Sequence, residues 1–203
     1  MNLIRIYMNL DLLGYVLIVF IIIIVYKIYS DSDMAQLKCI ISDVDGNKYC
    51  VRERKKLNEA ADHLAEVSVN LKLLVKDCKE NFPDTEITKN LTKGFNPKKI
   101  IETLPTSEFT AYSENKGEKL AFCLQKEKGQ SKLIDINTLT FVAIHELAHI
   151  ATTQVGHGDE FWNNFKFLLV RAKEINIYKP QDYKKNPERY CGMEITDNPY
   201  FDL

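Results

Sequence analysis

The chain has 203 residues, and its 27 Lys and Arg nearly balance its 28 Asp and Glu, which gives a formal net charge of −1. This balance provides no overall positive field, so the composition does not favour a nucleic acid as partner. The five cysteines are an odd number without a compact framework. They predict free thiols rather than a secreted disulfide scaffold, which favours a reducing side for the soluble part.

The amino-terminal segment is strongly apolar. Residues 12–26, LLGYVLIVFIIIIVY, contain no charged side chain, and the segment extends to residues 10–29 when its flanks, which include Asp11 and Lys27, are counted. A helix needs about 20 mostly apolar residues to cross the hydrocarbon core of a bilayer. We therefore expect residues 1–33 to form an N-terminal segment with a single transmembrane helix in a lipid bilayer. A cleaved signal is disfavoured because no Ala-x-Ala-like site follows.

The charges beside this segment do not set its orientation. Arg5 precedes the apolar run, whereas Lys27 and Lys38 follow it and are offset by nearby aspartates. Lys and Arg near the membrane determine topology, so this balance leaves the side of the following domain open. Because only residues 30–36 separate the apolar run from the first predicted strand, we expect that domain to lie close to the bilayer surface.

Residues 37–53, LKCIISDVDGNKYCVRE, predict a β-hairpin that turns at Asp45-Gly46. The spacing of Asp43, Asp45 and Asn47 is also that of a calcium-binding loop. Such a loop requires a glutamate at its twelfth position, where this chain has Arg54. We therefore interpret the segment as a turn.

Two helices are predicted in the first half of the main domain, which we expect to span residues 34–203. An amphipathic pattern over residues 55–80 predicts a long helix that ends at Phe82-Pro83. A shorter helix is predicted from Asn96-Pro97 to Glu102.

Residues 109–136 alternate between apolar and polar side chains and contain glycine turns at Lys116-Gly117 and Lys128-Gly129. This pattern predicts two or three antiparallel strands. Together with the helices, it indicates an α+β fold with a small antiparallel sheet.

The most informative motif is His145-Glu146-Leu147-Ala148-His149. Apolar residues recur around it at helical spacing, and Asn137 or Thr138 is a suitable N-cap. Two histidines four residues apart on a helix leave the same face one turn apart. This arrangement provides two imidazoles for a zinc ion, Zn²⁺, and it lets Glu146 reach a water as general base.

His157 follows the motif after Gly156, whose conformational freedom allows the chain to reverse and return towards the metal. We expect His157 to be the third zinc ligand, with Asp159 and Glu174 as oxygen-donor alternatives. Three protein ligands leave a coordination position open, as in catalytic zinc sites. The fourth histidine, His63, is interpreted as a surface residue.

The segment HELAHIATTQVGHGDEFWNNFKFLL resembles the active-site region of the SprT-like and WLM (Wss1-like) metalloproteases. The resemblance implies a zincin-like domain with His145, His149 and His157 as metal ligands and Glu146 as catalytic base. It also implies that Phe161-Trp162, in a helix predicted over residues 159–175, packs against the site.

The tail DYKKNPERYCGMEITDNPYFDL is also similar to predicted metalloproteases of large DNA viruses, which implies a host-cell or virion internal membrane. A strand is expected at Cys191 to Ile195, where Met193 is interpreted as filler rather than as a support beneath the metal. Tyr183 and Tyr190 are equal candidates for stabilising an oxyanion.

The resemblance implies a membrane-anchored metallopeptidase that hydrolyses peptide bonds, with a strand before the motif helix accepting an extended protein or peptide substrate. The alternative is a non-catalytic, zinc-binding membrane or virion structural protein. The presence of Glu146 favours the enzyme, because a purely structural zinc needs no base. DNA crosslink repair, the third hypothesis, conflicts with the membrane segment and the neutral charge.

Overall fold

The structure is a computed structural model that describes residues 2–127, 130 and 132–202. It divides into two compact units, Met1–Leu37 and Lys38–Leu203.

The first unit contains the long helix α1 (Asn2–Ser30) and the short helix α2 (Asp33–Gln36). Within α1, the window Leu13–Ser30 has a mean hydropathy of 2.3 and is 0% buried. Length and composition therefore fit a membrane span, and they fit a signal sequence near the amino terminus equally well.

The second unit is built on a five-stranded sheet with the order β1-β2-β3-β5-β4. Its strands are β1 (Leu37–Ile41), β2 (Lys48–Arg52), β3 (Ile100–Glu102), β4 (Ala111–Glu114) and β5 (Lys119–Phe122). The expected α+β class is confirmed, as are the first hairpin and the antiparallel β4–β5 pair.

The sheet is not antiparallel throughout, because β3 pairs in parallel with both β2 and β5. The segment up to Glu102 was predicted to be a helix, and its last three residues are instead this central strand. The side chain of Asn96 accepts a hydrogen bond from the Lys98 N–H (3.1 Å) and forms a turn that leads into the strand. Parallel pairing requires a long crossover, and the helices α3 and α4 between β2 and β3 provide it.

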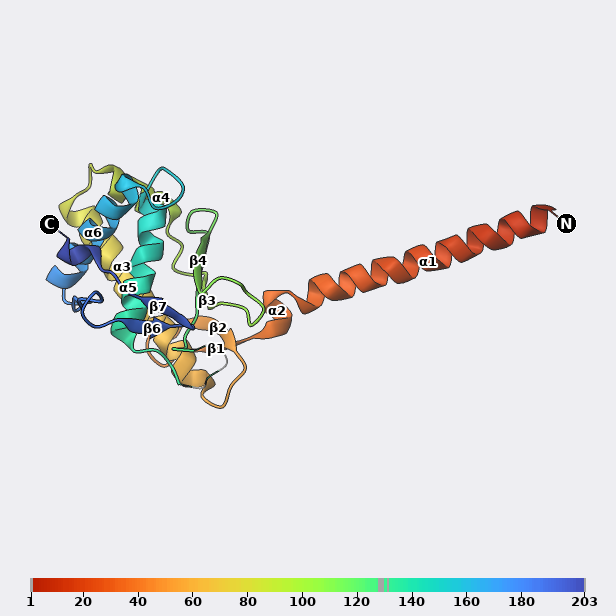
Figure 1. The fold of residues 1–203 in the computed structure, drawn as a ribbon, viewed down its shortest axis with the longest axis horizontal. Helices are drawn as coiled ribbons and strands as arrows, with labels where there is room; N and C mark the ends of the chain where they lie inside the picture. The colour runs from red at the N-terminus through yellow and green to blue at the C-terminus, as the bar shows by residue number, and fades with distance from the viewer. Residues whose placement is uncertain (1, 128–129, 131, 203) are drawn as a thin grey trace. The chain divides into compact units, whose positions relative to one another are not determined.

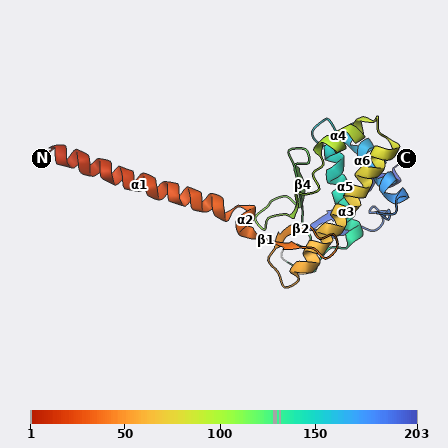
Figure 2. The ribbon, with the colours of Figure 1, turned by 180° about the vertical axis from the view of Figure 1, so that it is seen from behind.

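Four main helices accompany the sheet. They are α3 (Leu57–Asn81), α4 (Glu86–Gly94), α5 (Ile136–Ala151) and α6 (Asp159–Glu174). α5 packs against the other three, and α3, α5 and α6 run side by side in Figures 1 and 2. The predictions for α3 and α6 are confirmed to within two residues at each end, whereas α4 was not predicted.

The central helix α5 begins two residues earlier than the nearer of the two predicted N-caps, Asn137, allows. Asp135 is the N-cap, and its side chain accepts a hydrogen bond from the Thr138 N–H at 2.9 Å. Asn137 instead exchanges two hydrogen bonds with the backbone of Lys179, at 2.8 and 2.9 Å. Apart from His145 and His149 on its second half, nearly every residue of α5 is buried, so the helix forms the centre of the core.

The C-terminal segment forms a second, two-stranded sheet. β6 (Glu188–Tyr190) and β7 (Met193–Ile195) pair antiparallel and are followed by the short 3₁₀ helix η1 (Pro199–Phe201). A single strand was predicted from Cys191, but Cys191 and Gly192 have positive φ angles (52° and 81°) and form the turn of a hairpin.

The prediction of free thiols is wrong for four of the five cysteines. Cys39 is bonded to Cys50 across the first hairpin, and Cys123 is bonded to Cys191, which is 68 residues away in the sequence. Cys78 is free and buried in α3. The spacing of the cysteines did not reveal these pairs, because the fold brings together residues from separate elements.

Candidate metal centre

Three histidine side chains converge at the second half of α5. His145 and His149 come from the helix, and His157 comes from the loop that leads to α6. The Nε2 atom of His157 lies 3.2 Å from that of His145 and 3.1 Å from that of His149. All three can direct a ring nitrogen at one point, with the candidate ligand atoms within 4.8 Å of one another.

The loop that carries His157 is held at several points. α5 ends where the Thr152 N–H bonds to the Ala148 carbonyl (3.0 Å), and Gly156, with a positive φ of +96°, turns the loop that follows. The ammonium group of Lys116 donates to the carbonyls of Thr152 and Thr153, both at 2.8 Å. These contacts fix the loop and therefore the position of His157.

An aromatic side chain lies against the three imidazoles. The ring of Phe161 is fully buried and lies 4.4 to 4.9 Å from the rings of His145, His149 and His157. Of the three imidazole rings, Trp162 has a ring contact with that of His157, at 5.8 Å between centroids, and Trp162 is 41% exposed. The predicted packing therefore falls mainly on Phe161, which limits the rotamers that the imidazoles can adopt.

Burial and mutual repulsion keep the helix histidines neutral. Desolvation, followed by the charges of the other imidazoles, lowers the pKa of His145 to about 3. Desolvation and then His157 lower the pKa of His149 to about 4. Neutral imidazole is the form that binds a metal, so both side chains are ready to do so at neutral pH.

Glu146 lies beside the histidines and is 6% exposed. Desolvation raises the pKa of its carboxyl to about 7, while a hydrogen bond from the backbone of Ser113 in β4 acts in the opposite direction. A cation on the neighbouring imidazoles would also favour the carboxylate form. Glu146 is therefore a poorly solvated base in contact with β4.

A cavity of about 720 Å³ opens over the histidines and Glu146. Its lining comes from residues 109–113 with β4, the middle of α5, the loop 154–157, and the C-terminal segment with Tyr190 and residues 193–197. Lys116 and two residues of α6, Trp162 and Phe165, complete it. Its volume lies within the range of small-molecule and peptide-sized sites. Tyr190, a candidate for stabilising an oxyanion, lines this cavity, whereas the contribution of residues 193–197 to its wall was not predicted.

The alternative metal ligands lie elsewhere. Glu174 pairs with Arg171, and Asp159 begins α6, so neither joins the histidine cluster among the described residues. His63 is half-buried rather than fully exposed as expected, because its Nε2 atom lies 3.1 Å from the Ile134 carbonyl. It connects α3 to the segment before α5.

The two tyrosine candidates for an oxyanion role differ in position. Tyr190 lines the cavity, but its hydroxyl donates to the Thr110 carbonyl at 3.1 Å. Tyr183 is fully buried against Phe141 and lies outside the described lining. Met193 is half-exposed in the cavity wall and does not lie in the core beneath the histidines.

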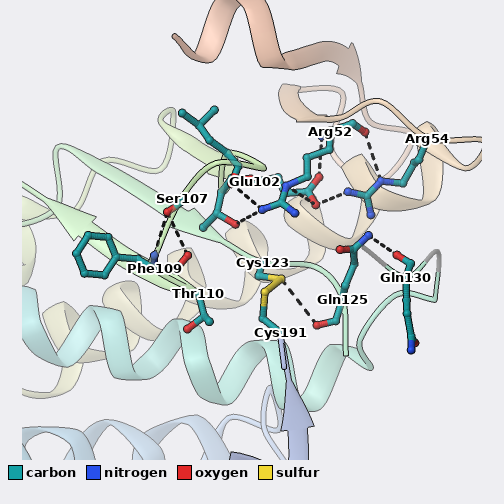
Figure 3. Close-up of polar contacts among 12 residues, drawn as sticks. Arg52, Arg54, Glu102, Ser107, Phe109, Thr110, Cys123, Gln125, Gln130 and Cys191 are labelled. Carbon is teal, nitrogen blue, oxygen red and sulfur yellow. Dashed lines mark hydrogen bonds and ion pairs between the residues drawn. A yellow bond between two sulfur atoms is a disulfide. The ribbon is translucent and has the colours of Figure 1, made fainter. Parts of the chain in front are cut away.

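A buried ion-pair network supports the segment that leads into β4 (Figure 3). The fully buried carboxylate of Glu102 pairs with Arg54 and accepts a hydrogen bond from the Arg52 N–H at 2.7 Å. The guanidinium of Arg52 donates to the carbonyls of Thr103 (2.6 Å) and Leu104 (2.8 Å). This network fixes the chain after β3, and no local sequence pattern indicated it.

Comparison with known proteins places this architecture in a family. Residues 87–200 match the WLM domain family, a range that includes α5, the three histidines and the C-terminal hairpin. The chain belongs to the WLM family. The WLM resemblance noted from the motif is thereby confirmed.

The WLM-domain chain has relatives in large DNA viruses. It is 29% identical over 173 residues to the uncharacterised protein R325 of Acanthamoeba polyphaga mimivirus, covering 83% of this chain and 87% of R325. It is 28% identical over 115 residues to protein 136R of Invertebrate iridescent virus 6, covering 54% and 64% of the two chains. The crystal structure of Wss1 from Saccharomyces cerevisiae superposes with a TM-score of 0.47 at 18% identity, covering 63% of this chain and 88% of Wss1.

Proposed function

We propose that this WLM-domain chain is a zinc-dependent peptidase that α1 anchors in a membrane. The observation that carries the proposal is the convergence of three imidazole nitrogens beside a buried glutamate in an open cavity. Membership in the WLM family supports it, because the motif resembles the active site of WLM metalloproteases.

The donor set fits zinc. Three neutral imidazoles suit this borderline-soft cation, and their cavity-facing side leaves room for a further ligand, as catalytic zinc sites require. In this proposal His145, His149 and His157 hold the ion. A zinc ion bound there would supply Lewis acidity, which polarises a water molecule and the scissile carbonyl.

Glu146 would perform the proton transfers. Its carboxylate accepts a proton from the water as the water oxygen bonds to the carbonyl carbon, and it delivers this proton to the amide nitrogen as the C–N bond breaks. Its burial supports this role, because a poorly solvated carboxylate is a stronger base.

β4 would orient the substrate. It is the outer strand of the sheet, pairs only with β5 in the sheet order, and contributes to the cavity lining beside Glu146. An extended peptide that pairs with an edge strand presents its carbonyls in a fixed register. The proposed substrate is therefore a protein or peptide segment in extended conformation.

The other candidate function is a zinc-binding membrane or virion protein without catalytic activity. The cavity over Glu146 favours the peptidase, since a structural zinc site needs neither a base nor an open face.

The test is Glu146→Gln in the full chain in detergent, with Glu66→Gln at an exposed position on α3 as matched control. The amide keeps the shape of Glu146 but cannot accept the proton. Cleavage of a quenched-fluorescence peptide library should fall by at least about a hundredfold, while zinc content and the control remain at the level of the original chain. Equal cleavage by the original chain and Glu146→Gln would rule out Glu146 as the base. Inactivity of the original chain against the whole library would favour the non-catalytic alternative.

A further inference from the structure

The C-terminal hairpin is too small to be stable alone. Each of its strands, β6 and β7, has three residues. An isolated two-stranded hairpin is at best marginally stable in water. Its position beside the cavity therefore depends on contacts with the rest of the domain.

These contacts concentrate on the segment after β5 (Figure 3). Cys191 is bonded to Cys123, and the N–H groups of Cys191 and Gly192 donate to the carbonyls of Gln125 and Lys126, both at 2.9 Å. The ion pairs Lys126–Glu188 and Arg189–Glu127 connect the same two segments. Both pairs are partly exposed to solvent, so they contribute little to holding the hairpin.

The place where the hairpin meets the segment after β5, called the junction below, also fixes the beginning of β4. The Thr110 carbonyl accepts hydrogen bonds from the Cys123 N–H (2.8 Å) and from the Tyr190 hydroxyl (3.1 Å). The Thr110 hydroxyl lies 3.2 Å from the sulfur of Met193. The disulfide thus joins Cys123, which bonds to the Thr110 carbonyl, to Cys191, which directly follows Tyr190. The hydroxyl of Tyr190 bonds to the same carbonyl.

We propose that Cys123 and Cys191 are positioning residues of the peptidase, whose disulfide holds the hairpin against β4 so that the cavity binds substrate. This inference rests on the proposed function. Two parts of the cavity wall depend on this junction, and they are residues 109–113 and residues 193–197. The catalytic histidines do not, because α5, α6 and Phe161 hold them.

Opening the disulfide should therefore weaken substrate binding and leave the histidine site in place. Reduction by dithiothreitol transfers two electrons and two protons to the sulfurs, which become two thiols, while dithiothreitol closes to its cyclic disulfide. Both cysteines are nearly inaccessible, at 0% and 2% exposure, so we expect reduction to require transient detachment of the hairpin.

The test compares two double variants of the full chain in detergent. Cys123→Ser with Cys191→Ser removes the disulfide that joins the hairpin to the segment after β5. Cys39→Ser with Cys50→Ser is the matched control, because its disulfide joins β1 to β2, and neither strand contributes a residue to the cavity lining. For peptide cleavage, the first variant should show a KM raised about tenfold or more with kcat changed less than about threefold. Its zinc content should be unchanged, and the control should keep the KM of the original chain.

An equal rise of KM in both double variants would show that the disulfides only stabilise the fold. An unchanged KM in the Cys123/Cys191 variant would show that the hairpin needs no covalent link. Either result overturns the proposal. If the Cys123/Cys191 variant does not fold, Tyr190→Phe tests whether the contact between the hairpin and Thr110 affects substrate binding, since it removes only the hydroxyl bond to Thr110. Its KM should rise about threefold or more, and an unchanged KM overturns the proposal.

Hydrogen exchange keeps this test separate from that of the proposed function. Amides of residues 188–195 should exchange at least about tenfold faster in the Cys123/Cys191 variant, while those of α5 remain protected. If the original chain cleaves no peptide, the proposed function fails, and this measurement still tests how the hairpin is held. Unchanged exchange over residues 188–195 overturns the positioning role.

Discussion

At the scale of single residues, the histidine cluster is maintained by apolar surroundings rather than by charged partners. Phe161 contacts all three imidazoles, and burial keeps His145 and His149 neutral. A metal can bind these nitrogens without displacing protons at neutral pH. The packing of the three rings and the neutral state of His145 and His149 are thus both suited to binding a cation.

The proposed zinc site should depend on each of its three histidines. We expect His145→Ala or His149→Ala to abolish zinc binding, and His157→Ala to weaken it strongly, because two ligands rarely retain zinc. His63→Ala is the control, since His63 lies outside the cluster. Elemental analysis of the purified chains measures this. Less than about a tenth of a zinc per original chain would contradict the proposed site.

Removing the ring of Phe161 should destabilise the domain. Phe161→Ala leaves a cavity in the core beside the histidines and should lower the free energy of unfolding by about 3–5 kcal/mol. Trp162→Ala should cost much less, because Trp162 is 41% exposed. Urea denaturation monitored by circular dichroism compares the two. Equal losses would show that Phe161 is not a packing centre.

At the scale of elements, α5 depends on neighbours that are themselves joined by a specific pair. Asp77 of α3 receives two hydrogen bonds from the guanidinium of Arg171 in α6, both at 2.9 Å. The same guanidinium lies over the ring of Phe82 at 4.9 Å. This pair therefore fixes α3 and α6 relative to each other, and both helices pack against α5.

This pair makes stability depend on acid pH. The hydrogen bonds from Arg171 hold the pKa of Asp77 below its usual value. Because the folded pKa is depressed, the stabilisation is fully present above the unfolded pKa of about 4 and is lost as pH falls below it. Asp77→Asn should lower the free energy of unfolding at pH 7 by about 2 kcal/mol.

The control for this prediction is Asp84→Asn, which changes an exposed aspartate. Denaturant unfolding at pH 7 and pH 3 should show the difference between Asp77→Asn and the original chain shrinking at the lower pH. A difference that is independent of pH would contradict the assignment to the Asp77–Arg171 pair.

At the scale of the whole molecule, an apolar helix and a disulfide-bonded unit occur in one chain. Disulfides persist in oxidising compartments. The pairing of four cysteines therefore removes the reason for expecting the second unit on a reducing side. In the proposed membrane-anchored chain, the redox state of these cysteines indicates on which side the second unit lies.

The redox state of the cysteines can be measured by counting free thiols. After denaturation without reductant, a maleimide reagent should modify one cysteine per chain, Cys78, and after reduction it should modify five. Mass spectrometry of the labelled chain gives both numbers. Five labels before reduction, in chain isolated with thiols trapped at lysis, would show that the disulfides do not form in the cell.

Membrane attachment should require the apolar segment. Residues of Leu13–Ser30 expose apolar side chains along the whole window, so the full chain should remain in the membrane pellet after washing with carbonate at high pH. A chain that begins at Met34 should be soluble. Release of the intact full chain into the supernatant would show that the segment binds only peripherally.

The sequence by itself determined the features that depend on local periodicity. His145 and His149 lie on one face because they are four residues apart on a single helix, and the apolar run in α1 can be recognised without knowledge of the fold. The extents of α3 and α6 also followed from the repeat of their apolar side chains. Each of these features depends on residues within a few turns of one another.

Only the tertiary structure decided the contacts between distant segments. The short segment ending at Glu102 is a central strand because it lies between β2 and β5 and its carboxylate is compensated by Arg52 and Arg54. Cys123 and Cys191 pair because β5 and the C-terminal hairpin meet at Thr110. Such contacts depend on how whole elements pack, and local propensity carries no information about which distant partner a side chain will meet.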